Sequence, residues 1–272
     1  MKRMMTRLFA LGALALSFHA FAEEGPALDN AAVNVQDIQS LQRGAKLFTN
    51  YCLSCHSAQA MRYNRLGDLG LSDQQIKDNL MFASIKTGDL MKVGMTPADG
   101  KTWLGAAPPD LSVIARSRSA DWLYTYLRSF YRDSSRPTGW NNAVFDKVGM
   151  PHVLWQLQGD QSLQIVDGAV DRKGAVTRSW EVEEADKDGK KAVKTYQLVL
   201  DRAGDLTRLA DGKANTLDYD QSVLDLVNYL VWMGEPAQAT RERIGTGVLL
   251  FLIFLLAPMA YLLKKEYWRD VH

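Results

Sequence analysis

Cys52-Leu53-Ser54-Cys55-His56 is the stretch that decides the fold, and it contains both cysteines of the 272-residue chain. Cysteines three residues apart lie on one face of a helical turn, so both sulfurs can form thioethers to the vinyl groups along one edge of a porphyrin. His56 follows directly, where its imidazole can bind the iron while the other ring nitrogen donates to a backbone carbonyl. The motif predicts one covalently bound haem c, attached through Cys52 and Cys55 and ligated by His56.

Two other uses of paired cysteines fit this motif less well. A thioredoxin-like C-x-x-C redox pair has no use for the adjacent His56. A zinc site built on cysteines needs a second pair, whereas this chain has two cysteines in all. We therefore interpret residues 52–56 as a haem-attachment segment.

The N-terminal segment, residues 1–22, has the pattern of a secretory signal peptide. Basic residues precede a mostly apolar stretch, Leu8 to Phe18, and the A-x-A sequence Ala20-Phe21-Ala22 precedes Glu23. Signal peptides combine these features, and the apolar stretch is short for a membrane span. We expect cleavage after Ala22. Export agrees with the haem motif, because c-type haem is attached on the exported side of a bacterial membrane.

A second apolar segment lies near the C-terminus. Ile244 to Leu263 is a run of 20 residues without a charge, which at about 1.5 Å per residue can cross a hydrocarbon core of about 30 Å. The basic and aromatic residues after it predict that the tail, residues 264–272, lies in the cytoplasm. We expect a single membrane-spanning helix, bent locally at Pro258, that anchors a periplasmic haem domain to the inner (cell) membrane of a bacterium.

The part between these two segments, residues 23–243, is about 220 residues long, which is enough for one haem domain with a substantial insertion. The whole chain carries a net charge of +1. Without the basic signal segment and the charged tail, the exported part is mildly acidic, with a net charge near −3. Such a surface has no basic field for nucleic acid, and it can steer a basic soluble partner.

Two segments have the periodicity of amphipathic helices. The first begins at Asp37, a residue type that caps helices, and repeats the apolar residues Leu41, Ala45, Phe48 and Cys52. The second ends at Gly234, with a proline two residues later, and repeats Val223, Leu226, Val227, Leu230 and Val231. If the two helices cross at Gly44, they close a pocket behind the haem. Trp122 and Tyr124 are expected to pack in the core.

The second axial ligand of the iron is narrowed by elimination. Outside the signal segment the histidines are His56, His152 and the terminal His272, which lies beyond the predicted membrane span. Other methionines of the exported part lie too close to the haem motif, in the closing helix or in ordinary apolar segments. Met150 and His152 remain. Met150 stands between a flexible glycine and a rigid proline, as a loop held against a porphyrin face requires.

Residues 157–218 have a different pattern. The runs Trp180–Glu183 and Val193–Leu200 alternate apolar and polar side chains, and Asp186-Lys187-Asp188-Gly189 between them is a strong turn signal. We predict a β-hairpin insertion at the surface of the haem domain. Three roles are open for it: covering the haem edge, contacting a neighbouring subunit, or only extending the surface.

Four segments together resemble the cytochrome c1 family, the haem subunits of quinol–cytochrome c reductase (bc1) complexes. Gly105-Ala106-Ala107-Pro108-Pro109-Asp110-Leu111-Ser112 resembles the family's PPDLS loop, and Val148-Gly149-Met150-Pro151 resembles its methionine-ligand loop. The other two are the haem motif and residues 228–236, which resemble the family's closing helix and W-x-x-E-P turn. The resemblance implies a mainly α-helical, class I cytochrome c-like domain with the β-hairpin insertion and one C-terminal transmembrane helix.

For single residues, the resemblance implies that His56 and Met150 are the axial iron ligands and that Pro109 lines the haem edge. It implies Arg118 as the partner of a haem propionate, and Arg116 is equally able to make that charge-assisted bond. The insertion departs from the mitochondrial pattern, so the family's docking surface does not transfer directly.

The function that the resemblance implies is the transfer of single electrons. A histidine–methionine pair leaves no open coordination position and raises the reduction potential, which suits Fe(III)/Fe(II) cycling. By resemblance, the donor is a Rieske iron–sulfur protein, the acceptor is a soluble or tethered cytochrome c, and the membrane neighbour is a cytochrome b. Quinol chemistry then belongs to the partners, and the chain alone catalyses nothing.

Two alternatives stay open on the sequence. The first is an anchored cytochrome subunit of another oxidase or dehydrogenase, which differs only in its partners. The second is a haem enzyme or gas sensor with a labile sixth ligand, for which His152 is the candidate distal base.

Overall fold

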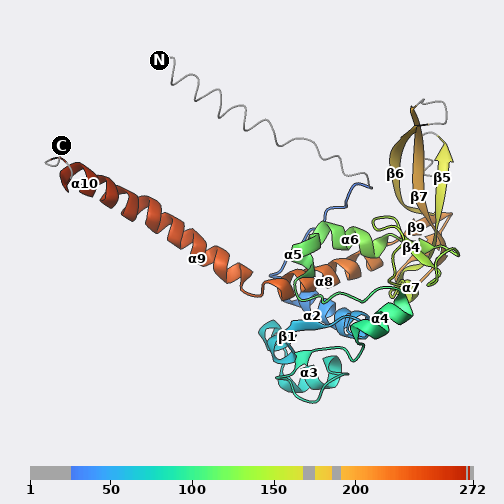
Figure 1. Ribbon diagram of the computed structural model, residues 1–272, viewed down its shortest axis with the longest axis horizontal. Helices are drawn as coiled ribbons and strands as arrows, with labels where there is room; N and C mark the ends of the chain where they lie inside the picture. The colour runs from blue at the N-terminus through green and yellow to red at the C-terminus, as the bar shows by residue number, and fades with distance from the viewer. Residues whose placement is uncertain (1–25, 168–174, 186–190, 268, 270–272) are drawn as a thin grey trace.

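The computed structural model describes residues 26–167, 175–185, 191–267 and 269. In this part of the chain a mainly helical domain carries a small β-sheet on one side, and a long C-terminal helix projects away from both (Figure 1). The predicted signal peptide and the predicted hairpin turn at 186–189 lie outside the described residues.

The helices and strands alternate irregularly along the chain. The helical elements are α2 (Ile38–Leu47), η1 (Phe48–Cys52), η2 (Tyr63–Leu69), α3 (Asp73–Leu80), α4 (Pro97–Leu104), α5 (Ile114–Arg118), α6 (Ala120–Arg128), α7 (Trp155–Gln158), α8 (Leu217–Gly234), α9 (Gln238–Phe251), η3 (Leu252–Leu256) and α10 (Ala257–Tyr267). The strands are β1 (Ala58–Arg62), β2 (Leu90–Met91), β3 (Phe130–Arg132), β4 (Trp140–Asn142), β5 (Gly159–Asp167), β6 (Val176–Ala185), β7 (Lys191–Ala203), β8 (Arg208–Ala210) and β9 (Lys213–Asn215).

Helix α2 begins where the sequence predicts. The Asp37 carboxylate accepts a hydrogen bond from the backbone N–H of Ser40 at 3.0 Å, which satisfies one of the free donors of the first turn. Leu41 and Ala45 are fully buried, and the helix runs directly into the π-helical turn η1, which ends at Cys52. A π turn adds one residue to the helical turn, so it shifts the face on which the attachment motif lies.

Helices α2 and α8 cross at Gly44, as the sequence predicts. A Cβ atom at Gly44 would lie 2.1 Å from the Asp225 carbonyl oxygen and 2.7 Å from Tyr229 Cβ, so only glycine permits this approach. Beside the crossing, the buried Asp225 carboxylate accepts hydrogen bonds from Ser40 Oγ at 2.6 Å and from the Arg43 guanidinium at 2.5 and 2.9 Å. Both carboxylate oxygens are paired, which avoids the cost of an uncompensated buried charge.

The hydrophobic core forms around this helix pair and includes η2, α3 and α6. Its largest fully buried side chains are Tyr63, Tyr219, Tyr229, Phe48 and Phe130. Phe48 and Tyr229 pack with their ring centroids 5.4 Å apart, which joins the end of α2 to α8. The core thereby fixes the segment that leads into the haem motif.

The insertion is a three-stranded antiparallel sheet of order β5-β7-β6. Its β6–β7 pair is the predicted hairpin, with Trp180 opposite Tyr196 and Val182 opposite Lys194. The sequence analysis did not predict β5, which pairs along the other edge of β7, or the β8–β9 hairpin. The β5 sequence lacks a sustained alternation, and its pairing with β7 is a long-range contact that no local pattern encodes.

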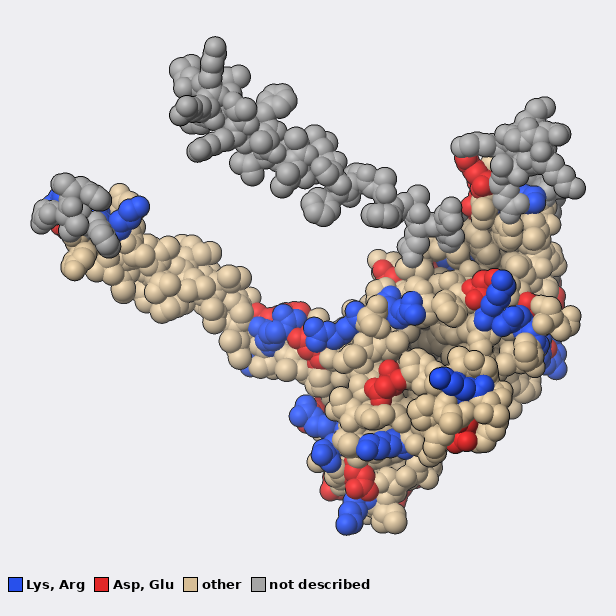
Figure 2. All heavy atoms as spheres, in the orientation of Figure 1, with Lys and Arg blue, Asp and Glu red and all other residues tan. Residues whose placement is uncertain are grey.

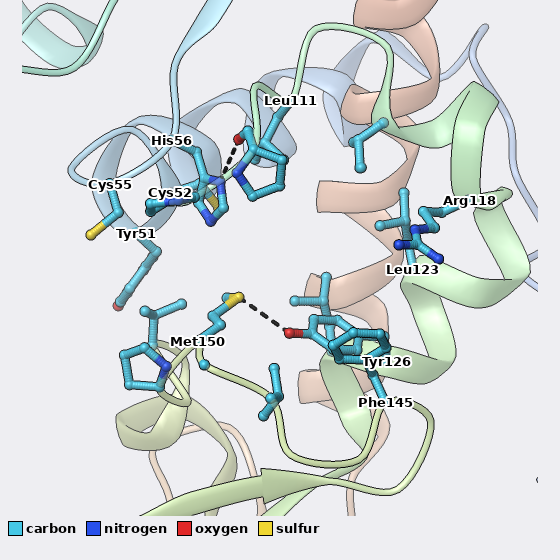
Figure 3. A pocket seen from close by; sticks show the side chains of 18 of the residues that line it. Tyr51, Cys52, Cys55, His56, Leu111, Arg118, Leu123, Tyr126, Phe145 and Met150 are labelled. Carbon is cyan, nitrogen blue, oxygen red and sulfur yellow. Dashed lines mark hydrogen bonds between the residues drawn. The ribbon is translucent and has the colours of Figure 1, made fainter. Parts of the chain in front are cut away.

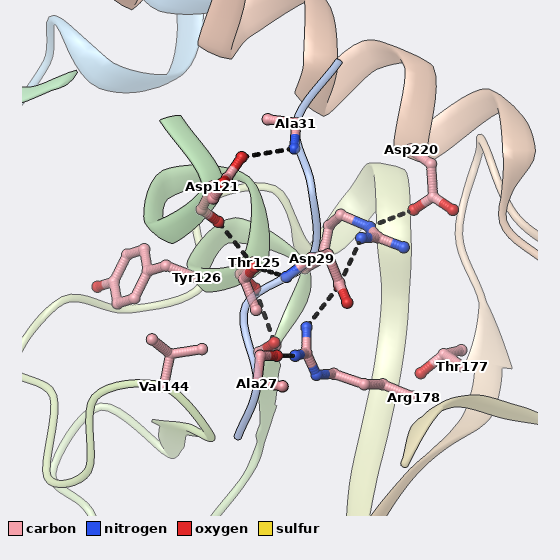
Figure 4. Close-up of polar contacts among 12 residues, drawn as sticks. Ala27, Asp29, Ala31, Asp121, Thr125, Tyr126, Val144, Thr177, Arg178 and Asp220 are labelled. Carbon is pink, nitrogen blue, oxygen red and sulfur yellow. Dashed lines mark hydrogen bonds and ion pairs between the residues drawn. The ribbon is translucent and has the colours of Figure 1, made fainter. Parts of the chain in front are cut away.

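The N-terminal segment, residues 26–36, is tied to the domain by polar contacts (Figure 4). Asp29 accepts from Arg128 at 2.9 Å and from Arg178 at 2.5 Å, and Arg128 also donates to Asp220 at 2.6 Å. The backbone N–H of Asp29 donates to the Thr125 hydroxyl at 2.8 Å. These contacts join the N-terminal segment to α6, to β6 of the insertion and to α8.

Elements α9, η3 and α10 form a long apolar helix. Residues Thr240–Tyr267 make a 28-residue candidate membrane span with a mean hydropathy of 2.4, and its most apolar stretch is not buried in the protein. This helix includes the predicted span, and Figure 2 shows an uncharged surface between charged groups near its two ends. The π turn η3 lies next to Pro258, which has no N–H to donate, so the helix is distorted where the sequence predicts a bend.

Candidate haem site

An apolar cavity of about 290 Å³ opens between the attachment motif, the loop that follows α4, helix α6 and the loop before α7 (Figure 3). All six predicted site residues line it: Cys52, Cys55, His56, Pro109, Arg118 and Met150. Most of the remaining wall is aliphatic or aromatic, and includes Leu104, Leu111, Ile114, Leu123, Leu127, Phe145, Val148, Val153, Leu226 and Leu230. The fold therefore brings side chains from distant parts of the sequence to one apolar space.

The two cysteines lie at one edge of this cavity. The backbone N–H groups of Cys55 and His56 both donate to the Cys52 carbonyl, at 3.1 and 2.9 Å, so the motif is a tight helical turn. Burial raises the pKa of the Cys52 thiol to about 12. A redox dithiol depends on a lowered thiol pKa, so this environment is unlike that of a thioredoxin-type pair. Among the described residues, no cluster of three or more His, Cys, Asp or Glu side chains could hold a metal ion.

The His56 ring is oriented by a backbone acceptor. Its Nδ1 lies 2.7 Å from the Pro109 carbonyl oxygen and donates to it, which leaves Nε2 as the nitrogen with a free lone pair. Burial lowers the pKa of His56, against the smaller opposing effect of the Pro109 carbonyl, and so favours the neutral imidazole that a metal requires. Pro109 thus acts on the site through its carbonyl as well as through its ring.

The loop that carries Pro109 is held against the haem motif by short hydrogen bonds. An Asp110 carboxylate oxygen accepts from the Gln59 N–H at 2.8 Å, and the Leu111 N–H donates to the Ser57 carbonyl at 2.8 Å. The acid and the leucine of the PPDLS segment therefore pin the loop to the residues that directly follow His56. This geometry explains why that segment stands beside a C-x-x-C-H motif.

Met150 projects into the cavity from the opposite side. Its sulfur accepts a hydrogen bond from the Tyr126 hydroxyl at 3.4 Å, and Figure 3 shows Met150 facing His56 across the open space. A Cβ atom at Gly149 would lie 2.9 Å from the Leu104 carbonyl oxygen, so glycine allows the loop to approach its neighbour closely. The sequence analysis missed Tyr126, although it lies one helical turn after Trp122 on the same face of α6.

His152 does not line the cavity. Its side chain is only 2% exposed, and burial lowers its pKa to about 3. The imidazole is stacked on Phe130, with ring centroids 4.8 Å apart, so it lies in an aromatic cluster behind the methionine loop. Of the two candidates left by elimination, only Met150 is placed toward His56.

The structure also separates the two candidate arginines. The Arg118 side chain lines the cavity, with its guanidinium carbon 5.1 Å from the ring centroid of Trp122. Arg116 does not line it, and its methylene groups lie next to Gly234 at the end of α8. The expectation that Trp122 is a core residue is incomplete, because this side chain stacks on Tyr126 at 4.7 Å and also forms part of the cavity wall.

These features fit a covalently attached porphyrin. Two thiols lie at one edge, an imidazole nitrogen and a thioether sulfur face each other across an apolar space, and a cation stands at the wall. The sequence pattern described as "Cytochrome C1 family" matches residues 29–271 of this chain. The chain belongs to the cytochrome c1 family. This confirms the predicted class I cytochrome fold and one covalently bound haem c, and it makes the protein a haem electron-transfer subunit of the bc1 type.

Individual relatives agree with this assignment. The chain is 46% identical to cytochrome c1 of Allochromatium vinosum over 249 residues, which cover 91% of each protein. It is 45% identical over 245 residues to a Nitrosomonas europaea protein named ammonia monooxygenase gamma subunit, with 90% of this chain and 89% of that one covered. It is 27% identical over 257 residues to "Cytochrome b/c1" of Bradyrhizobium diazoefficiens, with 87% of this chain and 34% of that one covered.

Proposed function

We propose that this cytochrome c1 family member passes single electrons from a Rieske iron–sulfur protein to a soluble or tethered cytochrome c, within a quinol–cytochrome c reductase complex. The observation that carries the proposal is the pairing of His56 and Met150 across one apolar cavity, each held from behind by a hydrogen bond. A haem iron held by histidine and methionine supplies reversible one-electron transfer at a raised potential.

The chain's own residues prepare this site for electron transfer. The Pro109 carbonyl holds the His56 tautomer, so that Nε2 is the ligand nitrogen. A thioether sulfur has two lone pairs, so Met150 can accept from Tyr126 with one and bind iron with the other. Arg118, at the cavity wall, is the residue that we assign to a haem propionate. Ligands fixed in advance reduce the structural change that accompanies a change of charge at the iron.

A haem enzyme or gas sensor is a weaker candidate. Such a protein needs an open or labile sixth position and a distal group that can move a proton. His152, the candidate distal base, is buried outside the cavity wall and is neutral over the physiological pH range. The arrangement of Met150 and His56 favours a closed iron site.

For the topology, we propose a signal peptide at residues 1–22, a periplasmic domain at 23–243, a transmembrane helix at 244–263 in the bacterial inner membrane, and a cytoplasmic tail at 264–272. The apolar, unburied helix Thr240–Tyr267 supports the anchor. Cytochrome b is the membrane neighbour in this proposal, and a relative that carries both names in "Cytochrome b/c1" supports it. Membrane lipid completes the surroundings of the anchor.

The ligand assignment is tested by Met150→Leu, which keeps apolar volume and removes the thioether. The oxidised protein is expected to lose its near-infrared methionine–iron band, and its midpoint potential should fall. Met61→Leu is the matched control, because Met61 is buried outside the cavity, and it should leave both quantities unchanged. An intact band in Met150→Leu would exclude Met150 as the ligand.

The complex is tested by a stop codon after Arg243. The truncated protein is expected to be soluble, haem-loaded and reducible, but membranes of that strain should lose quinol-dependent cytochrome c reduction. The anchor holds the haem near its donor at a high effective concentration, which a free domain lacks. Detergent purification of the full chain should recover cytochrome b and the Rieske protein. Full activity of the truncation strain would instead indicate an independent anchored cytochrome.

A further inference from the structure

An aromatic column stands behind the methionine loop. The His152 ring is stacked on Phe130, with centroids 4.8 Å apart and planes only 5° from parallel, and its other neighbour is Trp140, whose ring lies edge-on at 5.0 Å. The Arg132 guanidinium then covers Trp140, with its carbon 3.8 Å from the ring centroid. Phe130, Trp140 and His152 are at most 5% exposed, so the column is a packed and dry support.

The column continues into the β-sheet insertion. Arg132 forms an ion pair with Asp160 on β5 at 2.8 Å, and the other carboxylate oxygen of Asp160 pairs with Arg202 on β7 at 2.6 Å. The Arg202 guanidinium also faces the ring of Trp155 in α7, at 5.8 Å. The Asp160 side chain is 17% exposed, so both ion pairs are partly shielded from water. Asp160 therefore joins the insertion to the aromatic column.

The other end of the column reaches the iron site. Phe130 meets Tyr126 edge-on at 5.0 Å, and Tyr126 donates to the Met150 sulfur. His152 is also only two residues after Met150 in the chain, and Leu154 is 2% exposed. The loop that carries the sulfur is thus held at His152 and, through Tyr126, at the sulfur itself.

We propose that His152 is a positioning residue for the Met150 ligand, and that the β5-β7-β6 insertion keeps it in position through Asp160, Arg132 and Trp140. The inference rests on the proposed ligation of iron by Met150. It assigns the insertion a role beyond extending the surface: it braces the sixth ligand of this cytochrome from behind.

The physical reason is the weakness of a thioether as an iron ligand. The sulfur stays on the iron only if the loop is held in the ligating position, and any population with the loop displaced admits an external ligand. The apparent affinity for that external ligand rises in proportion to the displaced fraction. Two ring contacts on His152, each of the size measured for aromatic pairs, correspond to a change of about tenfold in this fraction.

The experiment measures imidazole binding to the oxidised, detergent-purified full-length holoprotein, together with the near-infrared band and the midpoint potential. His152→Ala should raise the affinity for imidazole about tenfold and lower the potential. His152→Phe keeps a flat ring, and His152 Nε2 has no hydrogen-bond partner among the described residues, so this variant should stay within about twofold of the parent protein. Asp160→Asn, which releases both arginines, should raise the affinity about threefold.

Trp180→Leu is the control for general weakening of the insertion. Trp180 stacks on Tyr196 at 5.7 Å in the same sheet but makes no ring contact within the column, so its replacement should leave imidazole affinity unchanged. Equal imidazole affinity in His152→Ala and the parent would overturn the positioning role, even if the variant unfolds at a lower temperature. Equal affinity in Asp160→Asn and the parent would overturn the bracing role, and this variant decides if His152→Ala does not accumulate. Absence of the methionine band from the parent itself would overturn the proposed ligation instead.

Discussion

Gly44→Ala tests the helix crossing on which the site is built. The added Cβ would lie 2.1 Å from the Asp225 carbonyl oxygen and 2.8 Å from its carbonyl carbon, so backbone must move by roughly 1 Å to reach ordinary contact. Overpacking a well-packed core costs typically 1–3 kcal/mol, and a clash with backbone belongs at or above the upper end of about 3 kcal/mol. Alanine recovers about 1 kcal/mol of helix propensity. The net expectation is a destabilisation of about 2–3 kcal/mol.

In a domain of this size that loss corresponds to a melting temperature about 4–12 °C below that of the parent. The assay is thermal unfolding of the detergent-purified holoprotein, followed by far-ultraviolet circular dichroism and by the haem absorption band. Both signals should shift, because α2 leads into Cys52 while α8 supplies Leu226 and Leu230 to the cavity. Gly67→Ala is the matched control, since its Cβ meets nothing within 4 Å. A Gly44→Ala protein as stable as the control would refute the close crossing.

Three further predictions concern the site and its supports. Cys52→Ser combined with Cys55→Ser should abolish covalent haem, and a haem-stained band at the mature mass after denaturing electrophoresis would contradict the attachment. Arg118→Gln should lower the midpoint potential by about 30 mV, a small shift because the exposed guanidinium is screened by water, whereas Arg116→Gln should not change it. The Ser135 hydroxyl, with smaller effects from other hydrogen bonds and Arg136, lowers the pKa of Asp133. The stability that Asp133 adds over Asp133→Asn should therefore be complete above pH of about 4 and disappear as pH falls through the lowered pKa; urea unfolding of both proteins across this range, with a pH-independent difference as the contrary result, measures it.

Much of the site could be predicted because its signals are local. The spacing of Cys52, Cys55 and His56 encodes haem attachment within a single helical turn, and glycine and proline around Met150 mark a constrained loop. The hairpin of β6 and β7 follows from alternation and a turn sequence, and the membrane helix follows from length and lack of charge. Each of these patterns depends on neighbours within about ten residues, where backbone geometry alone relates side chains to one another.

The sequence alone determined the haem motif, the crossing glycine of α2 and the existence of both the insertion and the anchor. Tertiary structure decided which of two nearby side chains turns toward the cavity: Met150 rather than His152, and Arg118 rather than Arg116. It also decided that Tyr126 supports the sulfur and that Asp160 reaches the methionine loop through an aromatic column. The physical reason is that these choices depend on contacts between segments far apart in the chain. Such contacts form only when the whole core packs, so residues that look equivalent in the sequence acquire different surroundings.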